Sequence, residues 1–206
     1  MVQSVTTPLT LEEFFESVPD NGRFELRNGV VVEMQPTGTH EQVAGFLAQQ
    51  LAVAIHTSAL PYLIPRQAIL KAVDSDLSGY NPDVVVLKKE ALKTEPLWIK
   101  RSTIVGGKTV VLAIEVVSTN WQDDYLLKQG EYERLGIPEY WIVDYLGLGG
   151  KRLIGDPKQP TLAICDLVEG EYQMRLLRAQ DPLVSRAFPS LNLTVEQIFA
   201  AGQDHF

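Results

Sequence analysis

Hydrophobic and polar residues alternate along several short segments of this chain, a pattern typical of β-strands with one buried face. The alternation continues on both sides of Asn28-Gly29, and this dipeptide is a strong signal for a two-residue hairpin turn. A second hairpin is predicted to turn at Glu169-Gly170. The pattern therefore predicts strands within residues 23–34, 62–72, 82–87, 109–117, 139–145 and 161–178.

Apolar residues recur at helical spacing in two longer segments, residues 39–57 and residues 121–136. Two short helices are predicted after Thr10 and after Thr194, each of which has the spacing of a capping box. The succession of strand, helix and strand in residues 109–145 suggests a parallel crossover. We therefore predict an α/β or α+β fold in which two main helices flank a mixed β-sheet.

The length of 206 residues suits one domain, and a content of 45% hydrophobic and 21% charged residues is ordinary for a soluble globular protein. No apolar stretch reaches the roughly 18–20 residues of a membrane span, and the first ten residues lack the signal-peptide pattern. We therefore expect a single cytoplasmic domain, residues 1–206. Cys165 is the only cysteine, which excludes an intramolecular disulfide and a thiolate-rich zinc site.

Two of the predicted strands each carry a carboxylate where burial is unfavourable. Asp83 begins the strand at 82–87, and Glu115 lies within the apolar run of residues 112–117. An ionised carboxylate buried without a partner is costly, so a basic side chain or a bound cation must compensate it. If the two strands pair, the carboxylates converge and offer the oxygen ligands that Mg²⁺ prefers.

The helix that follows Glu115 places Asp124 and Lys128 at positions i and i+4, on one face. Such a pair is often an ordinary surface ion pair that contributes a few tenths of a kcal/mol. However, only a short link joins this helix to the strand of Glu115, so its N-terminal half can reach the same cleft. Lys128 is therefore a candidate for holding or polarising an attacking water.

The sequence resembles the Uma-type family of restriction endonucleases, a branch of the PD-(D/E)XK nuclease superfamily, in four segments: FELRNGVVVEM, TGTHEQVAGFLAQQL, NPDVVVL and AIEVVSTNWQDDYLLKQGEYERLGIPEYWIVD. The segments occur in the family's order and extend from about Phe24 to Asp144. The resemblance implies a restriction-endonuclease-like core of about residues 23–145. It also implies an added N-terminal hairpin and a C-terminal extension, a hairpin plus a helix, at about residues 160–201.

The resemblance also assigns chemistry to individual residues. Asp83 and Glu115 match the acidic pair that binds Mg²⁺ or Mn²⁺, and the backbone carbonyl of Val116 is implied as an additional metal ligand. Val117 stands where the superfamily has its lysine. This departure has precedent in the family, whose lysine can lie on the following helix, and Lys128 stands at that place.

Four further residues are candidates for the site. Glu25 and His40 match the early acidic position and the helix-start histidine of the family, and Glu25 is a candidate third metal carboxylate. Asp124 is a candidate partner of Lys128, and Gln67 is a candidate for contact with the substrate. The implied activity is hydrolysis of phosphodiester bonds in double-stranded DNA, without a covalent intermediate, by a homodimer.

Two other classes of function remain open on the sequence. The formal net charge of −8 and the missing lysine favour a catalytically silent relative that binds nucleic acid or another protein. The acidity also suits a metal-dependent hydrolase of a small phosphorylated molecule. The presence of both Asp83 and Glu115 argues against a silent protein, since folding does not require them. Salt-sensitive, Mg²⁺-dependent binding to duplex DNA would distinguish a nuclease from a small-substrate enzyme.

Overall fold

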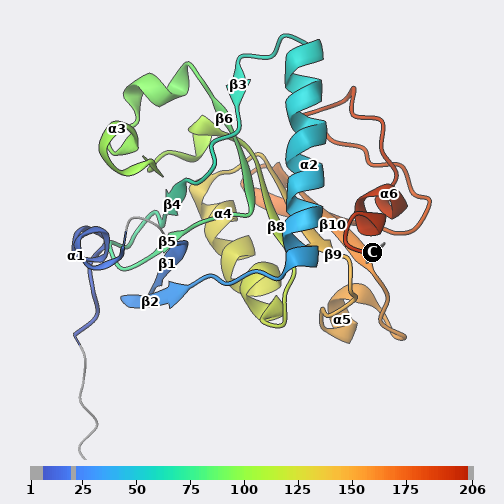
Figure 1. Cartoon of the computed structure of the whole chain (residues 1–206), viewed down its shortest axis with the longest axis horizontal. Coiled ribbons are helices and arrows are strands. Elements are labelled where there is room, and N and C mark those ends of the chain that lie inside the picture. The colour runs from blue at the N-terminus through green and yellow to red at the C-terminus, as the bar shows by residue number, and fades with distance from the viewer. Residues whose placement is uncertain (1–6, 20–21, 204–206) are drawn as a thin grey trace, which may run out of the picture.

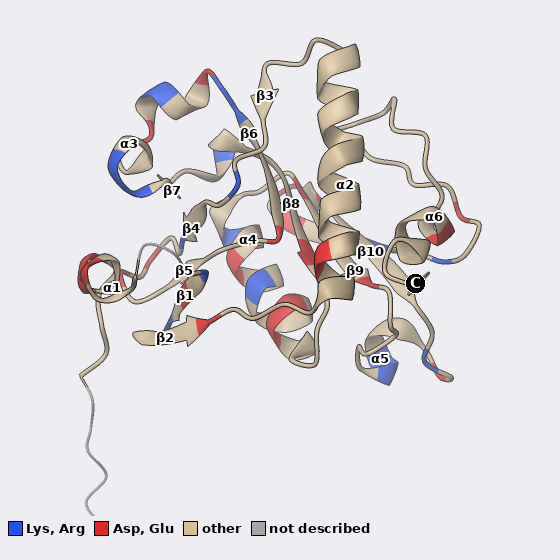
Figure 2. Cartoon of the chain, in the orientation of Figure 1, with Lys and Arg blue, Asp and Glu red and all other residues tan. Residues whose placement is uncertain are grey.

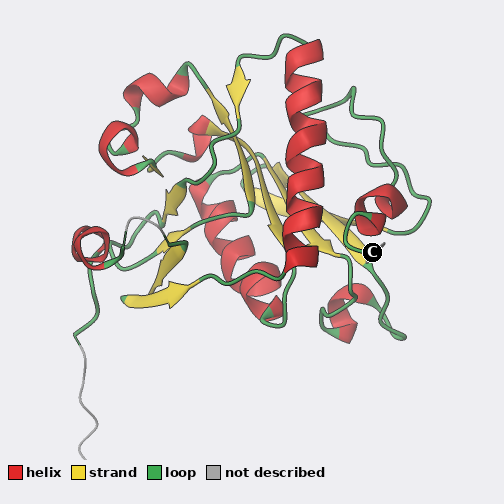
Figure 3. Ribbon diagram, in the orientation of Figure 1, coloured by secondary structure: helices red, strands yellow, loops and turns green. Residues whose placement is uncertain are grey.

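Two mixed β-sheets flanked by helices make up the chain (Figures 1 and 3). The computed structural model describes residues 7–19 and 22–203. Residues 1–6, which include most of the segment compared with signal peptides, lie outside the described residues. Within the described ranges, no helix is both long and apolar enough to cross a membrane.

The larger sheet has six strands in the order β11-β10-β9-β8-β6-β3. Strands β8 and β9 are parallel, and the other neighbouring pairs are antiparallel. The predicted crossover through the helix between β8 and β9 is therefore confirmed. The strands are β3 (Tyr62–Leu63), β6 (Val84–Lys88), β8 (Val110–Val116), β9 (Glu139–Asp144), β10 (Thr161–Val168) and β11 (Glu171–Leu177).

The smaller sheet has five short strands in the order β2-β1-β5-β4-β7. The prediction of one strand over residues 62–72 is wrong, because residues 62–63 belong to the larger sheet and residues 69–71 to the smaller one. Pro65 lies between them and cannot donate a ladder hydrogen bond. The strands are β1 (Phe24–Arg27), β2 (Val30–Glu33), β4 (Ile69–Lys71), β5 (Gly79–Tyr80) and β7 (Thr103–Ile104).

Two main helices cover opposite faces of the larger sheet (Figure 1). Helix α2 (Gly38–Thr57) packs on one face together with α6 (Val195–Ala200), and the continuous helix formed by η3 (Asp123–Lys128) and α4 (Gln129–Leu135) packs on the other. Because side chains alternate along β8, Glu115 lies on the same face as Ala113, the face covered by η3 and α4. The remaining helices are α1 (Leu11–Ser17), η1 (Ala91–Thr94), α3 (Trp98–Arg101), η2 (Gly107–Thr109) and α5 (Lys151–Ile154).

The local signals of the sequence are confirmed in the backbone. Both predicted capping boxes are present, one at Thr10 and one at Thr194. Asn28 and Gly29 have φ angles of 50° and 79°, and residues 169–170 have φ angles of 53° and 92°. Positive φ at both central residues is the requirement of the tightest hairpin turns, so these dipeptides set the register of β1–β2 and β10–β11.

Replacing Gly107 with alanine is expected to lower the free energy of unfolding by about 1–3 kcal/mol. A β-carbon at Gly107 would lie 1.9 Å from the backbone carbonyl oxygen of Leu135, at the end of α4, so the backbone would have to move. The control is Gly45→Ala within α2, where no heavy atom lies within 4 Å of the new β-carbon. That variant is expected to gain about 0.5–1 kcal/mol. Urea unfolding measures both, and equal effects of the two substitutions would contradict this packing.

Candidate active site

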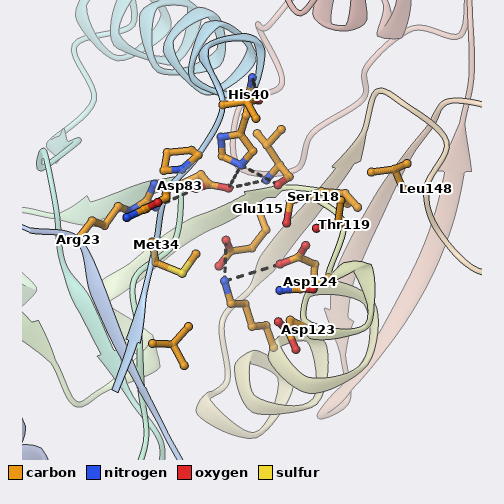
Figure 4. A pocket seen from close by; sticks show the side chains of 18 of the residues that line it. Arg23, Met34, His40, Asp83, Glu115, Ser118, Thr119, Asp123, Asp124 and Leu148 are labelled. Atoms are coloured by element: carbon orange, nitrogen blue, oxygen red, sulfur yellow. Dashed lines mark hydrogen bonds and ion pairs between the residues drawn. The ribbon is translucent and has the colours of Figure 1, made fainter. Parts of the chain in front are cut away.

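A pocket of about 360 Å³ lies where β1 and β2 of the smaller sheet meet the start of α2, the ends of β6 and β8, and helix η3 (Figure 4). The side chains that line it are unusually rich in charge for a partly enclosed space. The charged and titratable ones are Arg23, Arg27, Glu33, His40, Asp83, Glu115, Asp123, Asp124 and Lys128.

Asp83, just before β6, is held by the backbone N–H of Val116 and by His40. The backbone N–H of Val116 donates a hydrogen bond to Asp83 Oδ2 (2.7 Å), and His40 Nε2 lies 3.2 Å from the same oxygen. His40 Nε2 also lies 2.9 Å from the carbonyl oxygen of Val116. Because both neighbours of Nε2 are acceptors, this nitrogen carries the hydrogen of the imidazole. His40 therefore ties the start of α2 to both strands of the site.

Lys128 links the two sheets through buried ion pairs. Its side chain is 1% exposed, and Nζ lies 3.0 Å from Glu25 Oε1 on β1 and 3.0 Å from Glu115 Oε2 on β8. The other oxygen of Glu115 accepts a hydrogen bond from the hydroxyl of Tyr132 on α4 (2.7 Å). Each carboxylate thus has the partner that its burial demands, and Lys128 is the shared cation.

Helix η3 is a π-helix, although the sequence predicts an ordinary helix at this position. Single π-helical turns inside longer helices occur frequently at functional sites. Asp124 Oδ1 lies 3.7 Å from Lys128 Nζ, so the predicted pair forms a third, longer contact of the ammonium. Figure 4 shows Asp124 pointing toward Glu115, whereas Asp123 lies farther from Glu115.

Four buried carboxylates, those of Glu25, Asp83, Glu115 and Asp124, face three cationic side chains, those of Arg23, Arg27 and Lys128. Burial is the main cause that raises the pKa of Glu115, to about 8. The charge of Lys128 offsets this rise only in part, and the neighbouring carboxylates add to it. The same causes raise the pKa of Asp124 to about 7. With all four carboxylates ionised, their charge would exceed that of the three cations, and for this reason Glu115 and Asp124 hold protons up to neutral pH.

Asp83 shows the opposite behaviour. Burial alone would raise the pKa of its carboxyl, but the hydrogen bond and charge of His40, followed by the charges of Arg23 and Lys128, lower this pKa to about 2. For Lys128, burial alone would lower the pKa of the ammonium. The charges of Glu115 and Glu25 outweigh this effect and raise the pKa above its ordinary value. Asp83 is thus an anion and Lys128 a cation throughout the neutral range.

Without metal, the free energy of unfolding is expected to fall as the pH rises from about 5 to about 8.5. The pKa of Glu115 is about 8 in the folded protein and 4.5 ordinarily, so the folded state binds more protons in this range and loses that advantage as they dissociate. Urea unfolding in EDTA at several pH values measures the slope. Glu115→Gln should reduce the slope and leave the part due to Asp124, whose pKa is also raised, whereas Glu90→Gln, at a largely exposed carboxylate, should keep the full slope. A wild-type profile that rises over this range would contradict the argument.

The donor atoms of the pocket fit a hard divalent cation. Asp83 Oδ1 is buried and has no aligned hydrogen-bond donor among the described residues, although the Arg23 guanidinium lies 2.8 Å away. The carbonyl oxygen of Val116 accepts from His40 and retains a second lone pair. Among the described residues, no group of three or more His, Cys, Asp and Glu side chains is arranged to hold a metal ion by itself. Two carboxylates and a carbonyl nevertheless suit Mg²⁺, which usually keeps several waters.

The predicted site residues fall into three groups. His40, Asp83, Glu115, Val116, Asp124 and Lys128 line one pocket. Glu25 is fully buried and does not line it: Glu25 Oε1 contacts Lys128 and the N–H of Asn81, and Oε2 contacts Arg27. Gln67 lies apart and lines a second hollow.

Two arginines of the pocket were missed by the sequence analysis. Arg23 contacts Asp83, and Arg27 bridges Glu25 on its own strand to Asp123 on η3. The alternation in RFELR was the available signal, since it places Arg23, Glu25 and Arg27 on one face of β1.

The chain is similar to known proteins along nearly all of its length. The model of the Uma2 family, described as "Putative restriction endonuclease", matches residues 11–196. A comparison with curated proteins found no match. Among solved structures, the fold is similar to that of a protein from Anabaena variabilis ATCC 29413, described as a putative nuclease belonging to DUF820, with a TM-score of 0.71. The alignment covers 95% of this chain and 100% of that chain at 13% identity, which shows a shared fold.

Proposed function

Since this chain belongs to the Uma2 family of putative restriction endonucleases, we propose that it is an endonuclease that hydrolyses phosphodiester bonds of double-stranded DNA with Mg²⁺ or Mn²⁺. One observation carries the proposal: Asp83 and Glu115 converge from two paired strands on a pocket that also contains the buried ammonium of Lys128. A divalent cation would supply the positive charge that Glu115 and Asp124 need in order to ionise at neutral pH.

Asp83, Glu115 and the carbonyl oxygen of Val116 are the groups that would hold the cation. When bound, a divalent cation supplies charge stabilisation at the phosphate and lowers the pKa of a coordinated water. Glu25 has another role in this proposal. Because Glu25 does not line the pocket and its oxygens contact Lys128, Asn81 and Arg27, it holds the lysine in place from outside the pocket.

Lys128 orients the attacking water without removing its proton. Its ammonium stays protonated because Glu115 and Glu25 raise its pKa, so it can donate hydrogen bonds but cannot act as a base at neutral pH. The water oxygen attacks phosphorus directly and its proton passes to solvent, while the bond from phosphorus to the leaving oxygen breaks and that oxygen takes a proton from solvent. No covalent enzyme intermediate forms. Arg23 and Arg27 line the same pocket and supply positive charge for the approaching phosphate.

The acidic surface of the chain limits how DNA can approach. Figure 2 shows Lys and Arg concentrated around α3 and on α5, whereas α1 and α6 carry acidic residues. We propose that DNA contacts this protein over a short stretch of backbone at the pocket. The homodimer and the cytoplasmic location implied by the sequence stay predictions, and light scattering of the purified protein would test the first.

Cleavage of supercoiled plasmid DNA tests the proposed function. The purified protein is expected to convert the plasmid to nicked or linear forms with Mg²⁺ or Mn²⁺ and to leave it intact in EDTA. Asp83→Asn should remove the activity, whereas Glu90→Gln should retain it, because Glu90 lies on the surface away from the pocket. Calorimetric titration with Mg²⁺ on the same samples distinguishes a variant that no longer binds the metal from one that binds it but no longer cleaves DNA.

Three other outcomes would each change the proposed function. If the wild-type protein binds neither metal nor DNA, the proposal fails. If it binds DNA but does not cut, a nucleic-acid-binding module becomes the better description. If it binds metal and cuts only small phosphorylated compounds, the chain is a hydrolase of another substrate class.

A further inference from the structure

A second hollow of about 280 Å³ lies on the opposite face of β1 from the candidate active site. The alternation along the chain explains this division, since Arg23 lines the first pocket and Phe24 lines the second hollow. The walls of the hollow come from α1, β1, β4 and α3. Its side chains with distinctive chemistry are Phe14, Phe15, Phe24, Gln67, Asn81 and Arg101.

Asn81 is the most informative of these residues. It is only 3% exposed, and its carboxamide Oδ1 has no hydrogen-bond partner among the described residues. Its backbone, in contrast, is held on both sides: the N–H donates to Glu25 Oε1 (3.0 Å), and the carbonyl accepts from Arg23 Nη2 (2.9 Å). A buried polar atom without a partner is unfavourable in a folded protein, so a fixed carboxamide in a hollow indicates a ligand with a matching donor.

The remaining walls offer flat apolar surfaces. The ring of Phe15 is partly exposed and the guanidinium of Arg101 lies 5.2 Å above its centre, whereas Phe14 is buried behind it, with the two ring centroids 5.5 Å apart. Aromatic rings and arginine planes are the surfaces on which unstacked bases pack in proteins that bind single-stranded nucleic acid. A phosphate group alone would bind Lys100, Arg101 and the carboxamide N–H groups, but it would make no use of the ring of Phe15 or of the unpartnered carboxamide oxygen of Asn81.

We propose that this hollow binds one unstacked base of the DNA, and the proposal rests on the nuclease function proposed above. The base would pack against Phe15 and Arg101 and bond to the carboxamides of Asn81 and Gln67. Asn81 precedes Asp83 by two residues, so their Cα atoms are at most about 7 Å apart. The two sites nevertheless open on opposite faces of β1, so a base held in the hollow would add affinity for the DNA at a distance from the phosphate to be cut.

Fluorescence anisotropy of the full-length chain tests the base site in EDTA, which prevents cleavage. The probes are a labelled single-stranded DNA oligonucleotide and an oligonucleotide of the same length in which every base is replaced by an abasic site. The base-bearing oligonucleotide is expected to bind about tenfold more tightly. Phe15→Ala and Gln67→Ala should each reduce this difference at least threefold without changing the affinity for the abasic oligonucleotide. Ile99→Ala, at a residue of α3 that is 88% exposed and outside the hollow, is the control and should change neither.

Equal binding of the two oligonucleotides would overturn the proposal, and so would variants that weaken both probes alike. If Phe15→Ala fails to fold by circular dichroism, the exposed Gln67 still decides the question. Plasmid cleavage by the same preparations keeps the two proposals distinguishable. A protein that cuts DNA but binds abasic DNA equally well has no base site, and a protein that prefers bases but never cuts has no nuclease function.

Discussion

Lys128→Met is expected to lower the free energy of unfolding by about 3–5 kcal/mol at pH 8. Methionine replaces the length of the lysine side chain but not its ammonium, which lies 3.0 Å from a carboxylate oxygen of Glu25 and 3.0 Å from one of Glu115. Two fully buried carboxylates would then face each other without their shared cation. Breaking a buried ion pair by removing one partner is costly because the remaining charge stays buried.

The loss should depend on pH in a defined direction. Without the ammonium, Glu25 and Glu115 would hold protons more tightly in the folded state than in the unfolded state. Their folded pKa values would be raised, so the deficit of the variant should be smallest near pH 5 and should grow as the pH rises. Urea unfolding followed by circular dichroism at pH 5 and pH 8 measures this. Lys93→Met, at an exposed lysine paired with Glu90, should change stability by less than about 0.5 kcal/mol. A Lys128→Met protein as stable as wild type would contradict the buried ion-pair network.

Glu115→Gln is expected to reduce DNA cleavage by about 10³-fold, which corresponds to about 4 kcal/mol of lost transition-state stabilisation. The amide keeps the shape of the side chain, and its oxygen can still accept from Tyr132 or Lys128. The negative charge that would hold the cation is lost. Because burial raises the pKa of Glu115 to about 8, removal of its charge should not destabilise the fold at pH 8.

The matched control is Glu139→Gln, in the neighbouring strand β9. Glu139 is also about 1% exposed, but it accepts hydrogen bonds from Trp141 Nε1 and the N–H of Ala187 and does not line the pocket. That variant should lose stability and keep its specific activity. Initial rates on plasmid DNA at saturating Mg²⁺, with the folded fraction measured in parallel, compare the two. Equal rates for Glu115→Gln and wild type would remove Glu115 from the active site.

Much of the fold could be predicted because its signals are local. The capping boxes at Thr10 and Thr194 and the turns at Asn28-Gly29 and Glu169-Gly170 depend only on backbone geometry within a few residues. The family resemblance is confirmed by the match to the Uma2 model over residues 11–196. The division into two sheets was not predicted. Short strands such as β5 and β7 contain only two residues each, too few to show an alternation of hydrophobic and polar residues.

The candidate site was predictable in part for a similar reason. Asp83 stands directly before the apolar strand β6 and Glu115 interrupts the apolar strand β8, and both features are visible in the sequence. The roles of Glu25, Arg23 and Arg27 were less accessible, because a charged residue on a short strand looks the same whether it faces water or a buried partner. The place of Gln67, in a hollow across β1 from the active site, carries no sequence signal.

The sequence by itself determined the element types, the hairpin registers and the presence of two acidic residues, one directly before and one within an apolar strand, where burial of a charge is unfavourable. Tertiary structure alone decided which charges meet. Glu25, Glu115 and Lys128 are separated by up to about a hundred residues, yet they form one buried cluster because β1, β8 and η3 pack together. Ion pairing depends on distance and burial in space, and neither quantity is encoded by the spacing of residues along the chain.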